Sequence, residues 1–426
     1  MAVWQFNRGE WTEAYVFLRL LGDGRIYGAN DNLEKDELTY IDIINIIKDE
    51  PTQYIRFERF INEEVAEIQA IDKDDVVFKI ITAPELQTKA TLLYNQIKSV
   101  TGDRKISVPA IEEYLKELRF TSPKANLSDK AKDLYGAKSD IIITSVDSLD
   151  KTRNIIGFSI KSHLGSSPTL FNCSSTSGFI YKIIGCTEEA MHKLNLLDSF
   201  KSIIDYIRDN YALEFVSCKN EIFADNLSIV DSQMDKVLSS AILINSNYYK
   251  TVVETTDKKG NITSKEVVFT NLTDVSAKLS EINPLSIRKP DVFYVSKIKD
   301  LLFDSFAGLT ASTAWNGKKK ITGGYIDVNK DGEMLYYRAI SDDIFCNYLL
   351  ANTYFDRPDR GYMFKLAYAE AQAYTEGRSL TDSERNSIIY KNGVDGQKNA
   401  KKGDFGYVYQ KDGEYYIDIN FQIRFR

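Results

Sequence analysis

The first part of the chain alternates apolar and polar positions with the period of an α-helix. Within residues 9–22, apolar side chains recur at Trp11, Tyr15, Leu18 and Leu21. Positions three and four apart share one face of a helix, so this spacing predicts an amphipathic helix with a buried side. A glycine-rich turn follows and ends the predicted helix.

From residue 26 to about residue 84 the pattern becomes that of β-strands. Apolar runs separated by Asn, Asp, Glu and Lys occupy 54–60, 65–71 and 76–81. These runs predict antiparallel strands or hairpins. Two helices and then a polar, exposed linker are expected over 84–100, 108–120 and 121–138.

The centre of the chain holds two apolar, β-branched runs joined by a charged turn. The runs cover 141–144 and 155–160, and the turn covers 147–153. This layout predicts two paired strands connected by a hairpin loop. Asp140 precedes the first run and Lys161 follows the second. The hairpin therefore brings a carboxylate and an amine to the same end of a sheet.

The C-terminal half mixes helix and strand patterns. Helices are expected over 186–213, within 220–246 and over most of 292–313, and a hairpin over 247–270. The strand-rich segments 323–340 and 406–426 each contain the sequence KDGE. Its Asp-Gly pair favours a hairpin turn, and the residue needed to complete a calcium-binding loop is absent.

These elements predict an α+β protein with an α/β core. A mixed sheet is expected to be flanked by helices and to carry strand-rich additions. The chain is divided into three consecutive parts, 1–135, 136–320 and 321–426. The alternative is that these parts form one continuous domain.

Composition narrows the classes of function. The chain has two histidines, His163 and His192, and four dispersed cysteines, which leaves little for a zinc site or a Ser-His-Asp triad. The cysteines are expected to be reduced in a cytoplasmic protein. A net charge of −7 excludes a general nucleic-acid coat, although a basic groove can lie on an acidic body. No apolar run approaches the roughly 20 residues of a membrane span, and no signal peptide is expected.

Asp140, Ser159 and Lys161 follow the order of the nuclease core called PD-(D/E)xK, in which acid-x-lysine follows an aspartate. A carboxylate holds a hard divalent cation, and the lysine orients the attacking water or neutralises developing charge. Ser159 stands at the second acidic position, so one ligand is missing from the hairpin. Glu13, on the first predicted helix, is the preferred replacement. The competing interpretation is an ordinary exposed hairpin, with Glu10 and Glu13 interacting with the helix dipole.

Longer segments are more specific than this spacing. The chain resembles the HpaII family of type II restriction endonucleases in RGEWTEAYVFLRLLGDGRIYGANDNL (8–33), SDIIITSV and IIGFSIKSHLGSSPTLFN (139–172), GGYIDVNKDGEMLYYR, and GDFGYVYQKDGEYYIDINFQIRF. The block GFSIKS-x-LGS-x-x-TL is the most specific part of the resemblance.

The resemblance implies a PD-(D/E)xK restriction-endonuclease-like fold and Mg²⁺-dependent cleavage of double-stranded DNA. The expected target is a short palindrome, which is CCGG for the family's namesake. By the same resemblance, Asp140 and Glu13 bind the metal, Lys161 is the catalytic lysine and Ser159 holds the acidic position. Glu188 or Glu189, on a later helix, is an alternative source of the missing carboxylate. A cognate DNA methyltransferase is expected to act on the same site without a stable complex.

DNA contacts need Lys and Arg for phosphates, and Arg, Asn, Gln or Lys for base edges. The candidates are the loop residues Lys318, Lys319 and Lys320, then His163, Ser166 and Asn172 after the hairpin, and Arg288. Lysines over 398–402 form another basic cluster. A solvated surface is the more common explanation for each basic cluster, and 318–320 is the preferred DNA-binding cluster among them.

Two other functions stay open from the sequence. The first is a non-catalytic DNA-binding or interaction protein that kept the sheet but lost its metal site, which Ser159 favours. The second is a structure-specific nuclease, which the length of the chain disfavours. A palindromic target suits a twofold homodimer, and a monomer that cuts each strand in turn is the alternative.

Overall fold

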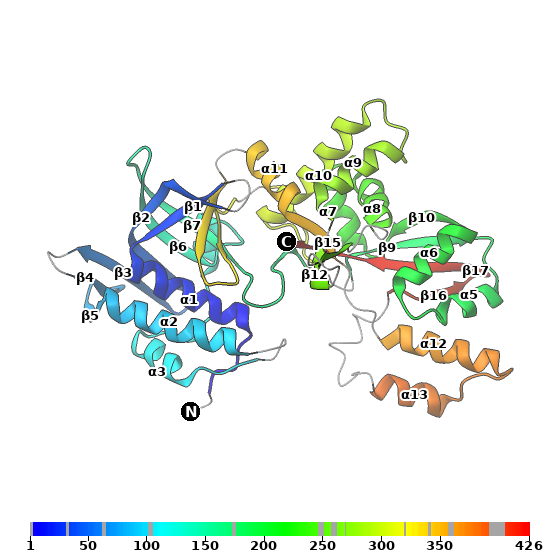
Figure 1. Ribbon diagram of the computed structural model, residues 1–426, viewed down its shortest axis with the longest axis horizontal. Helices are drawn as coiled ribbons and strands as arrows, with labels where there is room; N and C mark the ends of the chain where they lie inside the picture. Colours follow the sequence, from blue (N-terminus) through cyan, green and yellow to red (C-terminus); the bar gives the residue numbers. More distant parts are fainter. Residues whose placement is uncertain are drawn as a thin grey trace. The chain divides into compact units, whose positions relative to one another are not determined.

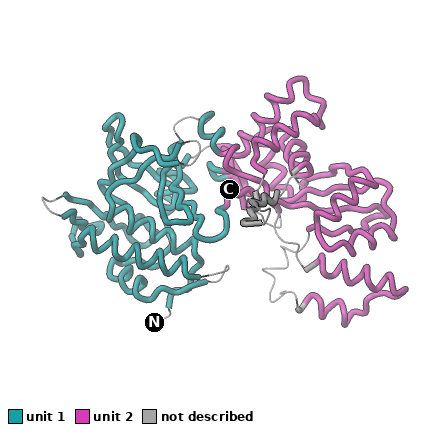
Figure 2. Tube along the Cα trace, viewed as in Figure 1, with its two compact units in different colours: residues 1–168, 306–308, 319–348 teal, residues 169–305, 309–318, 349–426 magenta. Residues whose placement is uncertain are grey.

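The computed structural model describes residues 3–30, 34–61, 65–100, 105–172, 176–245, 251–256, 262–268, 270–318, 321–339, 342–356, 362–391 and 405–426. The chain divides into two compact units (Figures 1 and 2). Unit 1 contains Met1–Pro168, Phe306–Gly308 and Lys319–Tyr348, and unit 2 contains Thr169–Ser305, Leu309–Lys318 and Leu349–Arg426. The units interleave along the chain, so they do not coincide with the three consecutive parts 1–135, 136–320 and 321–426.

Unit 1 is built on a nine-stranded mixed sheet of order β1-β14-β13-β7-β6-β2-β3-β4-β5. The strands are β1 (Arg25–Ala29), β2 (Lys35–Glu50), β3 (Gln53–Ile61), β4 (Ala66–Asp72), β5 (Val77–Thr82), β6 (Ile141–Asp147), β7 (Arg153–Ser162), β13 (Gly324–Val328) and β14 (Met334–Arg338). Strand β1 pairs with both β14 and the first half of β2, so this part of the sheet closes on itself. The predicted antiparallel strands and the central hairpin are confirmed.

Helix α1 (Arg8–Asp23) is the central helix of unit 1. Its start is fixed by a capping box, in which Asn7 and Glu10 satisfy each other's backbone N–H groups. From residue 11 to residue 22 only Glu13 and Arg19 are not buried, so the helix is covered far more completely than its amphipathic pattern predicts. Its apolar residues form one core with the sheet and with α2 (Ala83–Ser99) and α3 (Pro109–Glu117). The presence of the charged residue Glu13 in such a covered helix therefore needs an explanation.

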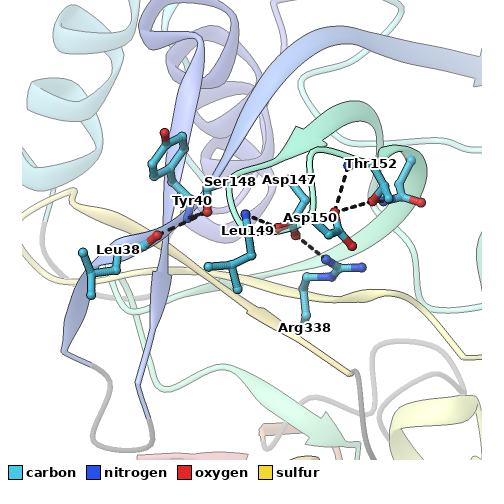
Figure 3. Close-up of polar contacts among 9 residues, drawn as sticks. Leu38, Tyr40, Asp147, Ser148, Leu149, Asp150, Thr152 and Arg338 are labelled. Atoms are coloured by element: carbon cyan, nitrogen blue, oxygen red, sulfur yellow. Dashed lines mark hydrogen bonds and ion pairs between the residues drawn. The ribbon is translucent and has the colours of Figure 1, made fainter.

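The turn that joins β6 to β7 is fastened to neighbouring strands (Figure 3). The buried Asp147 carboxylate accepts from the Leu149 backbone N–H at 2.8 Å and forms an ion pair with Arg338 of β14 at 2.5 Å. Ser148 bonds to β2, because its hydroxyl oxygen accepts from the Tyr40 N–H at 3.0 Å. These contacts fix the hairpin at its closed end.

Unit 2 combines small sheets with helices. One sheet has the order β10-β9-β17-β16, another β15-β18-β8, and β11 and β12 form a hairpin. The strands are β8 (Thr169–Phe171), β9 (Gly178–Ile184), β10 (Ala212–Cys218), β11 (Thr251–Thr256), β12 (Ile262–Val268), β15 (Thr353–Asp356), β16 (Val408–Lys411), β17 (Glu414–Asn420) and β18 (Gln422–Phe425). Its core contains an aromatic cluster of Phe171, Phe179, Phe223, Phe355 and Phe421.

The remaining helices are α4 (Asp129–Tyr135) in unit 1, then α5 (Glu188–Asn195), α6 (Phe200–Asn210), α7 (Glu221–Val230), α8 (Met234–Asn245), α9 (Leu272–Ile282), α12 (Tyr362–Thr375) and α13 (Asp382–Lys391) in unit 2. Helices α10 (Pro290–Ala307) and α11 (Asp342–Asn352) have residues in both units. None of the described helices is long and apolar enough to cross a membrane.

Two predicted elements were wrong in part. The helix expected over 186–213 is two helices, because Ser199 caps a new helix with its side chain, and the segment ends in β10. The linker expected over 121–138 contains α4 and buries Leu127. The prediction that most of 292–313 is helical is confirmed by α10, which ends at Ala307 before Gly308, whose φ is 131°. The tip of the hairpin within 247–270 lies outside the described residues.

Candidate active site

Asp140 lies immediately before β6 and is held by strand β7. Its backbone N–H donates to the Phe158 carbonyl at 2.8 Å. Its carboxylate accepts from the Ile160 N–H at 2.7 Å and from the Ser159 hydroxyl at 3.1 Å. The antiparallel register, in which Ile141 faces Phe158, brings these groups together. Asp140 is therefore oriented by the same strand end that carries Lys161.

Ser159 is 2% exposed and donates its hydroxyl to Asp140. A serine hydroxyl is a hydrogen-bond donor and a weak acceptor, whereas a carboxylate is an anionic metal ligand. In this arrangement Ser159 orients the Asp140 carboxylate. Ser159 therefore lies at the predicted site, but it does not replace the missing carboxylate ligand.

Glu13 of α1 and Asp140 line one small cavity of about 40 Å³. Its wall also includes Lys48 of β2 and the segment from Pro123 to Leu127. The Ala125 backbone N–H donates to the Glu13 carboxylate. A cavity of this size holds one or two waters or a small ion. The carboxylate expected from the first helix therefore does face the carboxylate at the start of the hairpin.

The two carboxylates and Lys161 perturb one another. Burial, followed by the charge of Asp140, raises the pKa of Glu13 to about 8. Burial raises the pKa of Asp140, against the opposing effect of Lys161. Burial lowers the pKa of Lys161, while Asp140 and Glu13 act in the opposite direction. Groups that interact in this way at a cavity are typical of functional sites.

Two lysines beside the site were not identified from the sequence. Burial, and then the charge of Lys161, lowers the pKa of Lys138. Lys48 is 7% exposed, forms an ion pair with Glu50 and lies 4.0 Å from the centre of the Phe120 ring. Lys48 could have been found from the sequence, because it is a charged residue within the apolar pattern of a predicted strand. Nothing in the local pattern singled out Lys138.

A third carboxylate, Asp327, reaches this region from a distant part of the chain. Strand β13 runs parallel to β7, and Asp327 lies in register with Lys161. The Asp327 carboxylate pairs with the His163 imidazole at 3.0 Å. The backbone N–H of His163 also donates to the Val328 carbonyl at 2.8 Å. His163, predicted to contact DNA, therefore contacts β13 in this structure.

The other predicted DNA-contacting residues that the structure describes are divided between the two units. Ser166 is exposed in unit 1, whereas Asn172, Arg288 and Lys318 are exposed in unit 2. Glu188 and Glu189 open helix α5 of unit 2. Lys319, Lys320 and the basic cluster over 398–402 lie outside the described residues.

The donor set suits a hard cation with few protein ligands. Among the residues that the structure describes, no three His, Cys, Asp or Glu side chains gather as a metal cage. Mg²⁺ is commonly held by one or two carboxylates together with waters and substrate phosphates. Glu13 and Asp140 face one cavity and repel each other there, which is the condition that a divalent cation relieves. The pair therefore fits Mg²⁺.

The chain as a whole is similar to a known family of proteins. Residues 7–371 match the family described as HpaII restriction endonuclease. The chain belongs to the HpaII restriction endonuclease family. It is 29% identical to the type II restriction enzyme HpaII of Haemophilus parainfluenzae over 428 residues, covering 98% of both chains. No solved structure matches it. Membership in the HpaII family confirms the resemblance and makes the chain a site-specific deoxyribonuclease whose substrate is double-stranded DNA.

Proposed function

We propose that this HpaII-family enzyme is a Mg²⁺-dependent type II restriction endonuclease that cuts a short palindrome related to CCGG. Asp140 and Glu13 are its metal ligands, and Lys161 is its catalytic lysine. The observation that supports these roles is the meeting of both carboxylates at one cavity beside the strand end that carries Lys161. The relative's identity supports the CCGG-like target.

The chain's own residues prepare the site in three ways. Ser159 and the Ile160 N–H hold the Asp140 carboxylate. The Ala125 N–H holds Glu13. Burial lowers the pKa of Lys161, so its amine loses a proton more readily than a solvated lysine does, and we assign it the role of orienting the attacking water. Bound Mg²⁺ supplies Lewis-acid polarisation of the scissile phosphate.

The proposal extends to the fold and the biological context. Helix α1, the antiparallel strands β2, β6 and β7, and the parallel strand β13 form the arrangement that we assign to a PD-(D/E)xK core. A homodimer would match a palindromic target. A cognate methyltransferase would protect the same site in the cytoplasm of the host.

Digestion of unmethylated plasmid DNA with Mg²⁺ tests the proposal. The wild-type protein should give discrete fragments, and Lys161→Ala should give none. Sequencing of the fragment ends identifies the target and the cut position. A smear without discrete fragments, or equal cleavage by the wild type and Lys161→Ala, would overturn the proposal.

Ser159 at the second acidic position, together with the lack of three gathered His, Cys, Asp or Glu side chains among the described residues, favours a second candidate, a DNA-binding protein without catalysis. Titration calorimetry with Mg²⁺, Mn²⁺ and Ca²⁺ separates the two candidates. Metal binding that Asp140→Asn removes supports the nuclease. DNA affinity without any metal binding supports the non-catalytic protein.

A further inference from the structure

The segment Leu309–Lys318 of unit 2 contains neither helix nor strand and is nevertheless tightly built. Its first part is anchored by Leu309 and Ala311, which are 1% and 2% exposed. Its outer part is exposed at Ser312, Thr313, Ala314, Asn316, Gly317 and Lys318. A surface segment that follows α10 directly and has this mixture of buried anchors and exposed polar groups is suited to binding.

One buried side chain organises this segment. Asn226 lies in the middle of α7 and is 1% exposed. Its amide NH₂ donates to the carbonyls of Thr310 and Thr313, both at 2.8 Å, and its amide oxygen accepts from the Trp315 N–H at 2.7 Å. All three bonds go to the backbone of one loop, and asparagine is a poor residue for a helix interior. The position of Asn226 is thus explained by the loop and not by the helix.

Local contacts complete the shape of the loop. The Thr310 hydroxyl accepts from the Thr313 N–H at 3.1 Å, and the Asn316 side chain accepts from the Lys318 N–H at 3.0 Å. Gly317 adopts a φ of 71°, and a Cβ there would lie 3.0 Å from Ile229 of α7. The loop is therefore held against α7 at both of its ends, and little conformational entropy is left to lose on binding.

The exposed groups of the loop have one chemistry. The segment LTASTAWNGK contains hydroxyls, an amide and an amine but no acidic residue, although the chain carries a net charge of −7. Hydroxyl, amide, lysine and backbone N–H donors are the groups that contact DNA phosphates, and these contacts position a protein on the duplex without reading sequence. Duplex DNA is already the substrate of this family.

We propose that Leu309–Lys318 is a loop that contacts the phosphates of duplex DNA, and that the buried Asn226 is its positioning residue. This inference rests on the proposed function and deepens it. Lys318 makes a direct contact, whereas Asn226 acts through the loop without reaching the DNA. Loss of Asn226 frees the backbone of three loop residues and removes several contacts at once.

Binding of a short duplex in Ca²⁺ buffer, measured over a series of salt concentrations, tests the proposal. Lys318→Ala should lower the slope of log affinity against log salt by about 1. Asn226→Ala should lower the slope further and weaken binding at least ~10-fold, equally for duplexes with and without the cut sequence. The double variant should bind little worse than Asn226→Ala, since both act through one loop.

Asn195→Ala is the matched control. Asn195 is also a buried asparagine of unit 2, 3% exposed, and bonds to the backbone N–H and carbonyl of Val408 at 2.8 Å. It should lose stability like Asn226→Ala and keep full DNA affinity. Equal DNA affinity of the folded Asn226→Ala and Asn195→Ala variants would overturn this inference. The proposed function would still stand in that case if the wild-type protein cuts plasmid DNA into discrete fragments. Weaker binding of Asn226→Ala at an unchanged salt slope would overturn the assignment to phosphates.

Discussion

The two ends of the β6–β7 hairpin each hold an aspartate of low exposure, and the protein treats the two differently. At the turn, Asp147 is paired with Arg338 and with a backbone N–H (Figure 3). At the open end, Asp140 shares a cavity with Glu13, and the pKa values of both carboxylates are raised. The first end uses charge to fasten the fold. At the second end, the repulsion between the two carboxylates costs stability, and a bound cation would relieve it.

The largest expected effect is on cleavage. Lys161→Ala should reduce the cleavage rate on the order of 10³-fold, because it removes the amine that we propose acts on the attacking water. Arg338→Ala, at the other end of the hairpin, should keep its rate per folded molecule. Single-turnover plasmid cleavage measures both variants. Similar losses would mean that the two ends do not differ in function.

For the free energy of unfolding, substitutions at the turn should have a larger effect than substitutions at the open end. Asp147→Asn leaves Arg338 without its carboxylate and should lower the free energy of unfolding by about 3 kcal/mol. Asp140→Asn removes a repelling charge and should lower it little or raise it. Urea denaturation of the two metal-free variants makes the comparison directly. A larger loss in Asp140→Asn would contradict the assignment of the two aspartates.

Bound metal should stabilise the folded protein only through Asp140 and Glu13, at the open end of the hairpin. Mg²⁺ at about 100 times its dissociation constant should raise the free energy of unfolding by about 2.7 kcal/mol. Glu13→Gln and Asp140→Asn should lose this gain, and Asp147→Asn should retain it. Thermal unfolding with and without Mg²⁺ provides the measurement. Retention of the gain in both Glu13→Gln and Asp140→Asn would place the metal elsewhere.

The pH dependence of stability should also come from the open end. In the folded, metal-free protein the pKa of Glu13 is raised from 4.5 to about 8, so the folded state holds a proton that the unfolded chain releases in this window. The free energy of unfolding should therefore fall as pH rises from 4.5 to 8, by up to about 1.4 kcal/mol per pH unit. Denaturation in EDTA should show this slope in the wild type and a flatter one in Glu13→Gln. An identical slope in the two proteins would remove Glu13 as its source.

The smallest expected effect belongs to Ser159. Ser159→Ala removes one hydrogen bond to Asp140, worth about 1–2 kcal/mol, and should slow cleavage about 10-fold or less. The same plasmid assay measures it. A loss as large as that of Lys161→Ala would show that the serine takes a direct part in the chemistry.

The elements that the sequence predicts correctly are the local ones. Helix α1, the β6–β7 hairpin and the β13–β14 hairpin are specified by periodicity and by turn residues close to them in the chain. The meeting of Asp140 with Lys161 follows from the hairpin alone. Glu13 entered the prediction through its place on a helix and through a family resemblance.

The rest depends on contacts between distant segments. Nothing in the pattern of β13 indicates that Asp327 lies in register with Lys161, because a parallel pairing leaves no turn signal. Asn226 resembles any polar residue of a helix until its three bonds to the loop are seen. The interleaving of the two units is equally invisible in composition.

The position of β13 in the chain has a consequence for biosynthesis. Its partner strand β7 is complete at Ser162, but Gly324, the first residue of β13, is translated only after most of unit 2. At roughly 5–20 residues per second, the ribosome needs on the order of ten to thirty seconds to span this interval. During that time the nascent sheet has an open edge beside Lys161. The nuclease sheet is therefore completed late in synthesis, and a chain that stops early carries the hairpin without its neighbouring strand.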